Sequence, residues 1–227
     1  MSAHSMSSLT KSDCFIEGHW VPTEKRFNVT NPATGEVLAE VADADDELTQ
    51  RAINVAETAL AKWRKKTARE RAVLLRKWYQ SMMDNKQALG ELMSAEQGKP
   101  IPEAVGEVEY GASFVDWFAG EAERINGDIL PLTDSSKRVL VTKEPVGVCA
   151  AITPWNFPNA MITRKIAPAL AAGCTIVVKP PQLTPLSSLA LAQLASEVGI
   201  PDGVINIIPT SDAKTVGKRL ATSPQVR

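Results

Sequence analysis

Several residue types that carry common protein chemistry are scarce in this 227-residue chain. Its three cysteines, Cys14, Cys149 and Cys174, are odd in number and have no Cys-x-x-Cys spacing. This pattern argues against a disulfide framework and a cysteine-based zinc site, and it fits a reducing compartment. The two histidines, His4 and His19, lack the spacing of metal ligands, so we expect no metal site. The sequence contains neither Gly-x-Gly-x-x-Gly nor a Walker A pattern, which excludes those two phosphate-binding loops.

An excess of charge of one sign is also absent. The chain has 25 Lys and Arg residues and 26 Asp and Glu residues, for a formal net charge of -1. This balance gives no electrostatic reason to expect a nucleic acid or an anionic membrane as partner. No run approaches the roughly 18 apolar residues that cross a bilayer, and the first residues lack the apolar segment of a secretory signal. We therefore expect a cytoplasmic protein with no nucleic-acid and no membrane partner.

The first part of the sequence predicts a disordered start, then strands, then helices. Residues 1–14 are Ser-rich, and we expect them to be disordered. Residues 15–41 are strand-like and are interrupted by turn residues, which predicts a small hairpin or meander. From residue 43 onwards apolar residues recur at spacings of three and four, which indicates helices. Thr67 and Glu70 have the spacing of a helix-starting capping box.

From residue 137 onwards, short apolar strands alternate with helices. This order predicts an α/β fold in which the strands form a parallel sheet with right-handed crossovers and helices on both faces. The predicted strands are 138–142, 146–152, 175–178 and 204–208, and the predicted helices are 161–172, 186–198 and 212–220.

Ligands of such sheets bind beyond the carboxyl ends of the strands, which places two loops, residues 153–158 and 179–185, at the predicted site. In the first loop, two prolines stiffen the backbone around Asn156. The Asn156 amide could donate to an oxygen that gains charge during a reaction. Alternatively, it bonds only to local backbone, as asparagines in turns often do.

Charged residues beside the two loops each allow two interpretations. Lys179 ends a buried strand, where its ammonium could pair with a phosphate or a ribose hydroxyl, or could be a solvated strand end. Arg164 lies among apolar neighbours in the helix after the first loop, so we expect it to be buried and to need a partner. That partner could be the carboxylate of a ligand or an internal Asp or Glu. Thr184 is predicted to be the N-cap of the next helix.

Four motifs of the second half occur together: ITPWNFP (152–158), MITRK (161–165), AGCTIVVKP (172–180) and TPLS (184–187). Two earlier motifs, NPATGE (31–36) and EQGKP (96–100), accompany them. In this combination and order they resemble the N-terminal half of an aldehyde dehydrogenase, and the resemblance runs from about Phe15 to Arg227. WNFPNAMITRK (155–165) and ERINGD (123–128) are most similar to the succinate-semialdehyde dehydrogenase subfamily.

The resemblance implies a Rossmann-like parallel sheet and an oxidoreductase that uses a nicotinamide cofactor. It implies that Asn156 is the side-chain donor of an oxyanion hole and that Arg164 binds the distal carboxylate of succinate semialdehyde. Lys179 would contact the adenosine ribose or its 2′-phosphate. The residues implied to line the cofactor site are Ile152, Thr153, Pro154, Trp155, Asn156, Lys179, Pro180, Pro181 and Gln182.

Gln182 departs from the pattern of the NAD-preferring relatives, which usually carry Glu three residues after the lysine. A carboxylate there accepts hydrogen bonds from the ribose hydroxyls and repels a 2′-phosphate. The neutral amide of Gln182 removes this repulsion and leaves Lys179 free to pair with the phosphate. We therefore expect NADP as the cofactor, with NAD as the alternative.

The resemblance also implies that residues needed for turnover lie outside these 227 residues. In the family, the segment similar to Ser223–Arg227 leads into a glycine-rich loop, a glutamate base and a cysteine nucleophile in a Gly-Gln-x-Cys context. The chain contains no Gly-Gln-x-Cys segment, and Cys149 and Cys174 do not lie in such a context. We expect the catalytic domain to be missing and the chain by itself to have no dehydrogenase turnover.

The implied organisation has four parts: a disordered start (1–14), the N-terminal strands and helices of the cofactor-binding domain (15–129), a strand of an oligomerisation arm (130–145), and a truncated Rossmann-like core (146–227). The arm implies a homo-oligomer. A sheet that ends after three crossover strands leaves an exposed edge, so we also expect the isolated chain to be marginally stable or to self-associate. Two other functions remain open: a non-catalytic truncated chain that keeps an assembly surface, and a dehydrogenase for another acidic semialdehyde such as glutarate semialdehyde.

Overall fold

A computed structural model describes residues 4–227 of the chain. The strand-rich start consists of two antiparallel hairpins, as the turn residues predict. Glu17 and Gly18 make the first turn with positive φ angles of 57° and 77°. The strands are β1 (Cys14–Ile16), β2 (His19–Val21), β3 (Arg26–Thr30) and β4 (Val37–Ala42).

The predicted disorder of residues 1–14 is wrong for the part that the structure describes. A short helix, α1 (Met6–Leu9), follows an N-cap at Ser5. Leu9 and Cys14 are fully buried, because α1 packs against α4 and α7 and Cys14 begins a strand of the main sheet. Residues 1–3 lie outside the described residues. One apolar side chain in a Ser-rich segment is too weak a sequence signal to predict this packing.

Four helices follow the hairpins. The predicted capping box is confirmed: the Thr67 hydroxyl accepts from the Glu70 N–H, and the Glu70 carboxylate accepts from the Thr67 N–H. Gly98 ends the third of these helices in a left-handed conformation with φ of 85°. The helices are α2 (Asp46–Trp63), α3 (Ala68–Asp84), α4 (Lys86–Gln97) and α5 (Ile101–Ala122).

The second half of the chain alternates strand and helix and confirms the predicted parallel sheet. Strands β7, β8 and β9 are parallel neighbours, and the full sheet order is β2-β1-β9-β8-β7. The elements are β7 (Val148–Ile152), α6 (Ala160–Ala172), β8 (Thr175–Lys179), α7 (Leu186–Glu197), β9 (Ile205–Ile207) and α8 (Ala213–Thr222).

The sheet is mixed, which the sequence did not predict. The N-terminal strand β1 runs antiparallel to β9, with Phe15 opposite Ile207. The first hairpin therefore covers the β9 edge, and the expected exposed edge lies at β7. The other edge strand, β7, has one further parallel bridge, from Val148 to Val226.

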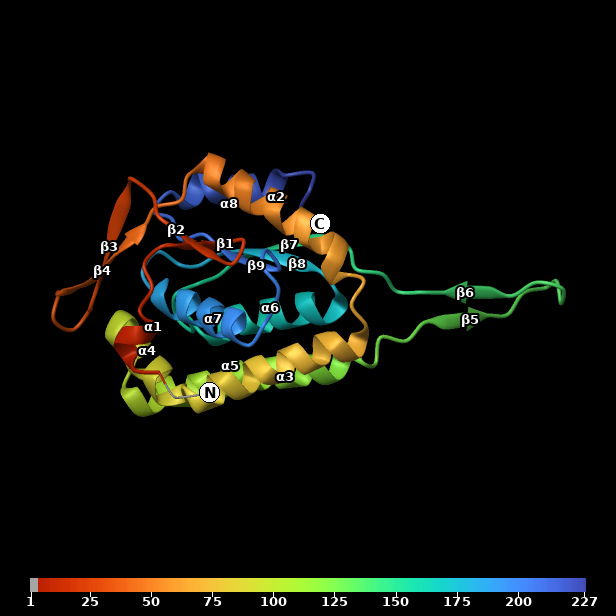
Figure 1. Ribbon diagram of the computed structural model, residues 1–227, viewed down its shortest axis with the longest axis horizontal. Coiled ribbons are helices and arrows are strands. Elements are labelled where there is room, and N and C mark those ends of the chain that lie inside the picture. The colour runs from red at the N-terminus through yellow and green to blue at the C-terminus, as the bar shows by residue number, and fades with distance from the viewer. Residues whose placement is uncertain (1–3) are drawn as a thin grey trace.

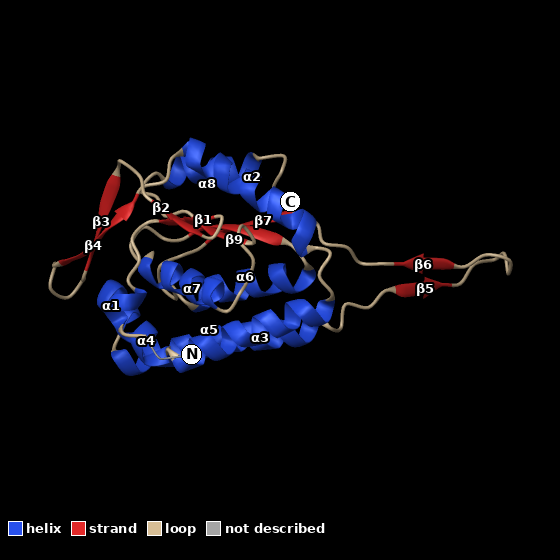
Figure 2. Ribbon diagram, in the orientation of Figure 1, coloured by secondary structure: helices blue, strands red, loops and turns tan. Residues whose placement is uncertain are grey.

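The elements form layers around this sheet (Figure 1). Helices α2 and α8 lie over one face of the sheet, and α6 and α7 cover the other. Helices α3 and α5 pack on the far side of α6 (Figure 2). Trp78 of α3 is fully buried there and donates from its indole Nε1 to the Leu191 carbonyl at 3.1 Å, which ties the outer layer to α7.

One hairpin projects away from the layers (Figure 1). Strands β5 (Asp128–Leu130) and β6 (Val139–Val141) pair antiparallel, and every residue in both strands is exposed. The predicted arm began at residue 130, but the paired segment begins at Asp128. In the described part of the chain, no helix is long and apolar enough to cross a membrane.

Candidate functional site

The two predicted loops meet at the carboxyl ends of β7 and β8. Ile152 is the parallel partner of Lys179, and the Thr153 N–H donates to the Lys179 carbonyl at 3.2 Å. The loops at 153–158 and 179–185 therefore start side by side, as the strand order predicts.

A buried ion pair supports the first loop from outside the sheet. Glu107 of α5 is 4% exposed and pairs with Lys99. The Lys99 ammonium lies 3.5 Å from the Asn156 carbonyl oxygen and 4.4 Å from the centre of the Phe157 ring. The loop is thus held by a charge that belongs to the segment between α4 and α5. The EQGKP motif contains Lys99, but its sequence gave no sign of this contact.

Glu107 also fixes the start of α6. Its Oε1 accepts from the backbone N–H groups of Asn159 at 3.0 Å and Ala160 at 3.3 Å. These groups lie at the helix N-terminus, where unpaired donors and the helix dipole favour a negative charge. One carboxylate therefore aligns the end of the 153–158 loop with the helix that carries Arg164.

The Asn156 side chain is exposed on this braced loop. Among residues 4–227, its amide group has no hydrogen-bond partner, so the alternative of a local backbone bond is not observed. The backbone contact to Lys99 leaves the amide free to donate to a ligand. Its role in an oxyanion hole stays a prediction.

Lys179 is 4% exposed, which is rare for a lysine. Its ammonium donates to the Pro180 carbonyl at 3.0 Å, and no carboxylate in the described residues lies within ion-pair distance. Burial lowers the pKa of this ammonium. A buried cation without an internal counter-charge is a suitable partner for a ligand phosphate or hydroxyl, and the alternative of a solvated strand end is not what the structure contains.

The surroundings of Lys179 combine exposed apolar and buried polar groups. Ile152 is 50% exposed, and its Cδ1 lies 3.7 Å from where a Cβ would stand at Gly217, so α8 packs beside this exposed apolar side chain. The Thr153 hydroxyl is buried without a partner. Pro180 and Pro181 are buried, whereas Pro154, Trp155 and Gln182 are exposed. The sequence did not predict the part that α8 plays in this surface.

Arg164 is exposed, so its predicted burial is wrong. The apolar neighbours Ile162 and Ile166 point into the core on the other side of α6, and Arg164 lies on the outer face. Its guanidinium carbon stands 5.0 Å from the centre of the Phe114 ring. No described carboxylate pairs with it, so the alternative of an internal ion pair is not observed.

The N-termini of the helices after the parallel strands are already occupied by carboxylates. Glu107 takes that position at α6, and Asp212 accepts from Thr215 at 3.0 Å at α8. At α7, Glu96 accepts from the N–H groups of Leu186 and Ser187, each at 2.8 Å. The predicted N-cap at Thr184 is therefore wrong: its hydroxyl has no partner, and a carboxylate from α4 replaces it.

Glu96, whose carboxyl group lies at the N-terminus of α7, is almost completely buried, with 3% of the residue exposed. Burial raises the pKa of its carboxyl to about 7, although the two backbone donors at α7 oppose that rise. Glu96 also lines a cavity of about 210 Å³ with Trp155 and Thr184, so it lies close to both loops.

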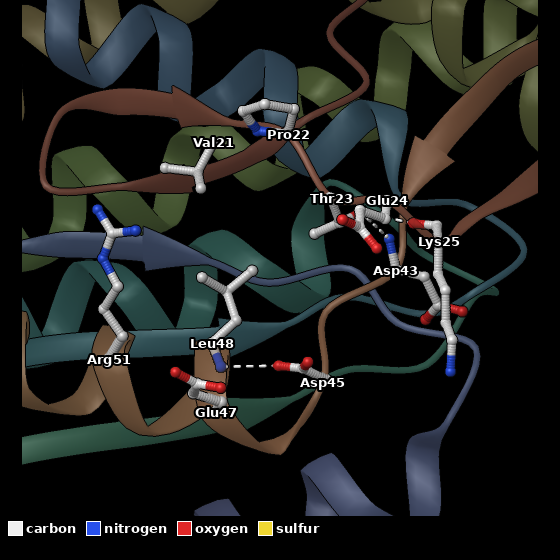
Figure 3. Close-up of a pocket in the computed structure, with 10 residues that line it drawn as sticks. All are labelled: Val21, Pro22, Thr23, Glu24, Lys25, Asp43, Asp45, Glu47, Leu48 and Arg51. Atoms are coloured by element: carbon white, nitrogen blue, oxygen red, sulfur yellow. Dashed lines mark hydrogen bonds between the residues drawn. The ribbon is translucent and has the colours of Figure 1, made fainter.

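A second cavity, of about 420 Å³, lies between the β2–β3 connection and the start of α2 (Figure 3). Its lining is rich in acidic side chains, and two of these are already engaged: Asp45 accepts from Leu48 at 2.8 Å and Asp43 from the Ser211 N–H at 2.7 Å. An acidic lining does not suit a phosphate-bearing cofactor. None of the predicted site residues lines it. In residues 4–227 no group of three His, Cys, Asp or Glu side chains is placed to hold a metal ion.

A mixed α/β sheet with two loops at the carboxyl ends of its parallel strands has the architecture of the dinucleotide-binding α/β class. The sequence profile of the aldehyde dehydrogenase family matches residues 20–227, and the chain belongs to this family, whose members are oxidoreductases. It is 52% identical to 3-sulfolactaldehyde dehydrogenase of Pseudomonas putida, over 97% of this chain and 46% of that protein. It is 50% identical to human mitochondrial succinate-semialdehyde dehydrogenase, over 97% of this chain and 42% of that protein. The chain thus spans about half the length of the curated relatives it matches.

Solved structures agree with the fold. An NADP-dependent enzyme of E. coli has a TM-score of 0.95 at 50% identity, covering 97% of this chain and 46% of that chain. Betaine aldehyde dehydrogenase from Staphylococcus aureus, in complex with NAD+, has a TM-score of 0.93 at 32% identity, covering 97% and 45%. These relatives support a nicotinamide cofactor: the first is described as NADP-dependent and the second was solved with NAD+.

The buried Glu96 predicts a pH dependence of stability. Because the pKa of its carboxyl rises from 4.5 to about 7 on folding, the folded state holds a proton in that range that the unfolded state releases. The wild type should therefore lose stability relative to Glu96→Gln as pH rises from about 4.5 to about 7, by at most roughly 3 kcal/mol. Urea unfolding of both proteins at several pH values measures this difference.

The exposed carboxylate of Glu103 provides the control. Glu103→Gln makes the same chemical change at an exposed position and is the matched control. If the free energy of unfolding changed with pH by the same amount in the wild type and in Glu96→Gln, the raised pKa of Glu96 would be contradicted.

Proposed function

We propose that the protein to which this chain belongs oxidises an aldehyde with a distal anionic group, succinate semialdehyde in the first place, and passes the hydride to NADP or NAD. The observation that carries the proposal is Arg164: an exposed guanidinium without an internal carboxylate, on the helix that begins next to Asn156. A planar guanidinium without a partner can donate two parallel N–H hydrogen bonds to a carboxylate at the far end of a substrate.

The names of the two relatives support this choice. Succinate semialdehyde and 3-sulfolactaldehyde both carry an acidic group away from the aldehyde, a carboxylate in one and a sulfonate in the other. Glutarate semialdehyde, which is one methylene longer than succinate semialdehyde, is the alternative substrate. The length of the pocket decides between these, and Arg164 serves all of them.

The residues of this chain would divide the work. Lys99 and Glu107 fix the loop, so that the Asn156 amide can donate to the oxygen that gains charge when a thiolate from outside these 227 residues adds to the aldehyde. Lys179 and Ile152 would hold the adenosine end of the cofactor. The nicotinamide, when bound, supplies the hydride acceptor.

The projecting β5–β6 hairpin supports a proposed homo-oligomer. Ile129 and Leu140 are each 71% exposed, although both are large apolar residues. Apolar strands that stand clear of the core are typical of surfaces that a second chain covers. The expected cytoplasmic location stays a prediction.

The first experiment is to read the coding sequence past codon 227 and to assay the encoded protein. A protein that continues into a glycine-rich loop and a Gly-Gln-x-Cys segment should produce NADPH or NADH from succinate semialdehyde, and the 227-residue chain alone should produce none. Turnover by the 227-residue chain would overturn its predicted inactivity. If a stop codon follows Arg227 instead, the proposed dehydrogenase fails and the non-catalytic assembly role takes its place.

In the active protein, Arg164→Ala should raise KM for succinate semialdehyde by at least about tenfold, since a charge-assisted bidentate contact is worth roughly 1.5–3 kcal/mol. A neutral aldehyde of similar length should be affected much less. Arg164→Lys keeps the positive charge but loses the paired N–H donors of the guanidinium. Its KM for succinate semialdehyde should lie between those of the wild type and Arg164→Ala. An equal rise in KM for the acidic and the neutral aldehyde would contradict the proposed binding of the substrate carboxylate by Arg164.

The cofactor preference is tested at Gln182. Gln182→Glu should lower kcat/KM for NADP by about tenfold or more and change that for NAD less, because a carboxylate beside the 2′-phosphate is repulsive. Gln87→Glu, an exposed site on α4, introduces the same charge away from the loops and is the control. A wild-type enzyme that prefers NAD would refute the expected NADP preference directly.

A further inference from the structure

The guanidinium of Arg164 lies over an aromatic ring of the neighbouring helix. Its Cζ stands 5.0 Å from the centre of the Phe114 ring, within the roughly 6 Å over which the face of a ring attracts a cation. Tyr110 packs edge to face against Phe114, with 4.9 Å between the ring centres. Because Tyr110 and Phe114 are four residues apart in a helix, both rings lie on the same face of α5.

This contact depends on the close packing of α5 against α6. The Glu107 carboxylate of α5 accepts from the Ala160 N–H of α6 at 3.3 Å. One turn further along α5, a Cβ added at Gly111 would stand 3.3 Å from the Ala160 Cα, so the two helices meet there without room for a side chain. Phe114 follows Gly111 by three residues, and Arg164 follows Ala160 by four, so each lies about one turn beyond this close approach. The packing of α5 on α6 therefore brings the Phe114 ring to Arg164.

The ring restricts the guanidinium without using its N–H donors. In residues 4–227, the guanidinium forms one further contact, in which Nη1 donates to the Met161 sulfur at 3.8 Å. No described carboxylate lies within ion-pair distance of it. A free arginine side chain has many rotamers, and binding an anion costs the free energy of restricting them. A ring that stacks on the guanidinium meets part of this cost in advance, whereas an Asp or Glu partner would occupy the donors and neutralise the charge.

We propose that Phe114 is a positioning residue for Arg164, and that its ring orders the guanidinium before the distal anionic group of the aldehyde binds. The inference rests on the proposed function, in which Arg164 binds that group. Phe114 acts through Arg164 and contributes to the preference for acidic over neutral aldehydes. Tyr110 holds the Phe114 ring from the other side of the contact.

The test is the KM of the active protein for an acidic and a neutral aldehyde of similar length. Phe114→Leu should raise KM for succinate semialdehyde about two- to fivefold, the factor that a cation–π contact at an exposed site contributes. It should leave kcat and the KM for the neutral aldehyde unchanged, and Phe114→Tyr, which keeps the ring, should match the wild type. A fall in kcat, or an equal rise in KM for both aldehydes, would mean that Phe114 only packs α5 against α6, and would overturn the proposal.

A double-mutant cycle separates this proposal from the proposed function. In the Arg164→Ala background, Phe114→Leu should cause no further rise in KM for succinate semialdehyde, because no guanidinium remains to be ordered. The same rise in both backgrounds would overturn the role of Phe114 and leave the proposed function intact. If Arg164→Ala alone had no selective effect on the acidic aldehyde, the proposed function would fail, and the role of Phe114 with it.

Phe118, one turn further along α5, provides the matched control. It is also half-buried and packs against the core, and in the described part of the chain no Lys or Arg lies over its ring. Phe118→Leu should leave the ratio of the two KM values unchanged. If Phe114→Leu does not fold, Phe114→Met removes the ring with a flexible apolar side chain and should give the same selective rise. An unchanged KM ratio in the variant that folds contradicts the proposal.

Discussion

The buried carboxylate of Glu107 controls the geometry of the candidate site. It pairs with Lys99 and accepts from two backbone groups at the start of α6, so α5, α6 and the 153–158 loop are fixed relative to one another. Lys99 carries the constraint to the Asn156 carbonyl. Removing one partner of such a buried pair typically costs about 3–5 kcal/mol, because the other charge remains in a medium that solvates it poorly. The loop that presents Asn156 is therefore held in place by contacts to the helices behind it.

The helix N-termini at the described strand ends are not free to bind an anionic ligand. In many α/β proteins an anionic ligand uses a helix N-terminus. Here Glu107, Glu96 and Asp212 already occupy the N-termini of α6, α7 and α8. The positive charge available between the described strand ends is a side chain, Lys179, which is buried and lacks a counter-charge. In the proposed function, recognition of the cofactor by the side chains of Lys179 and Gln182 would respond to single substitutions at these two positions.

The parts of the structure that depend on local sequence could be predicted, and those that depend on distant contacts could not. The alternation of strands and helices gave the parallel sheet, and the strand order then placed Lys179 beside Thr153. The antiparallel β1 and the burial of Leu9 depend on surfaces that form only when the whole chain has folded. Arg164 shows the limit of periodicity: apolar neighbours established that α6 is buried on one face, but not that Arg164 lies on the other.

The position of β1 has a consequence for the order in which the protein can fold. A hydrogen bond from the Glu17 N–H to the Asn206 side chain joins residues 189 apart in sequence, next to the β1–β9 pairing. Ribosomes add about 5–20 residues per second, so β1 would wait on the order of 10–40 seconds for its partner to be synthesised. During that time β1 has only its hairpin neighbour β2 to pair with. Because a contact between residues so far apart in sequence forms slowly, we expect the pairing of β1 with β9 to come late in folding.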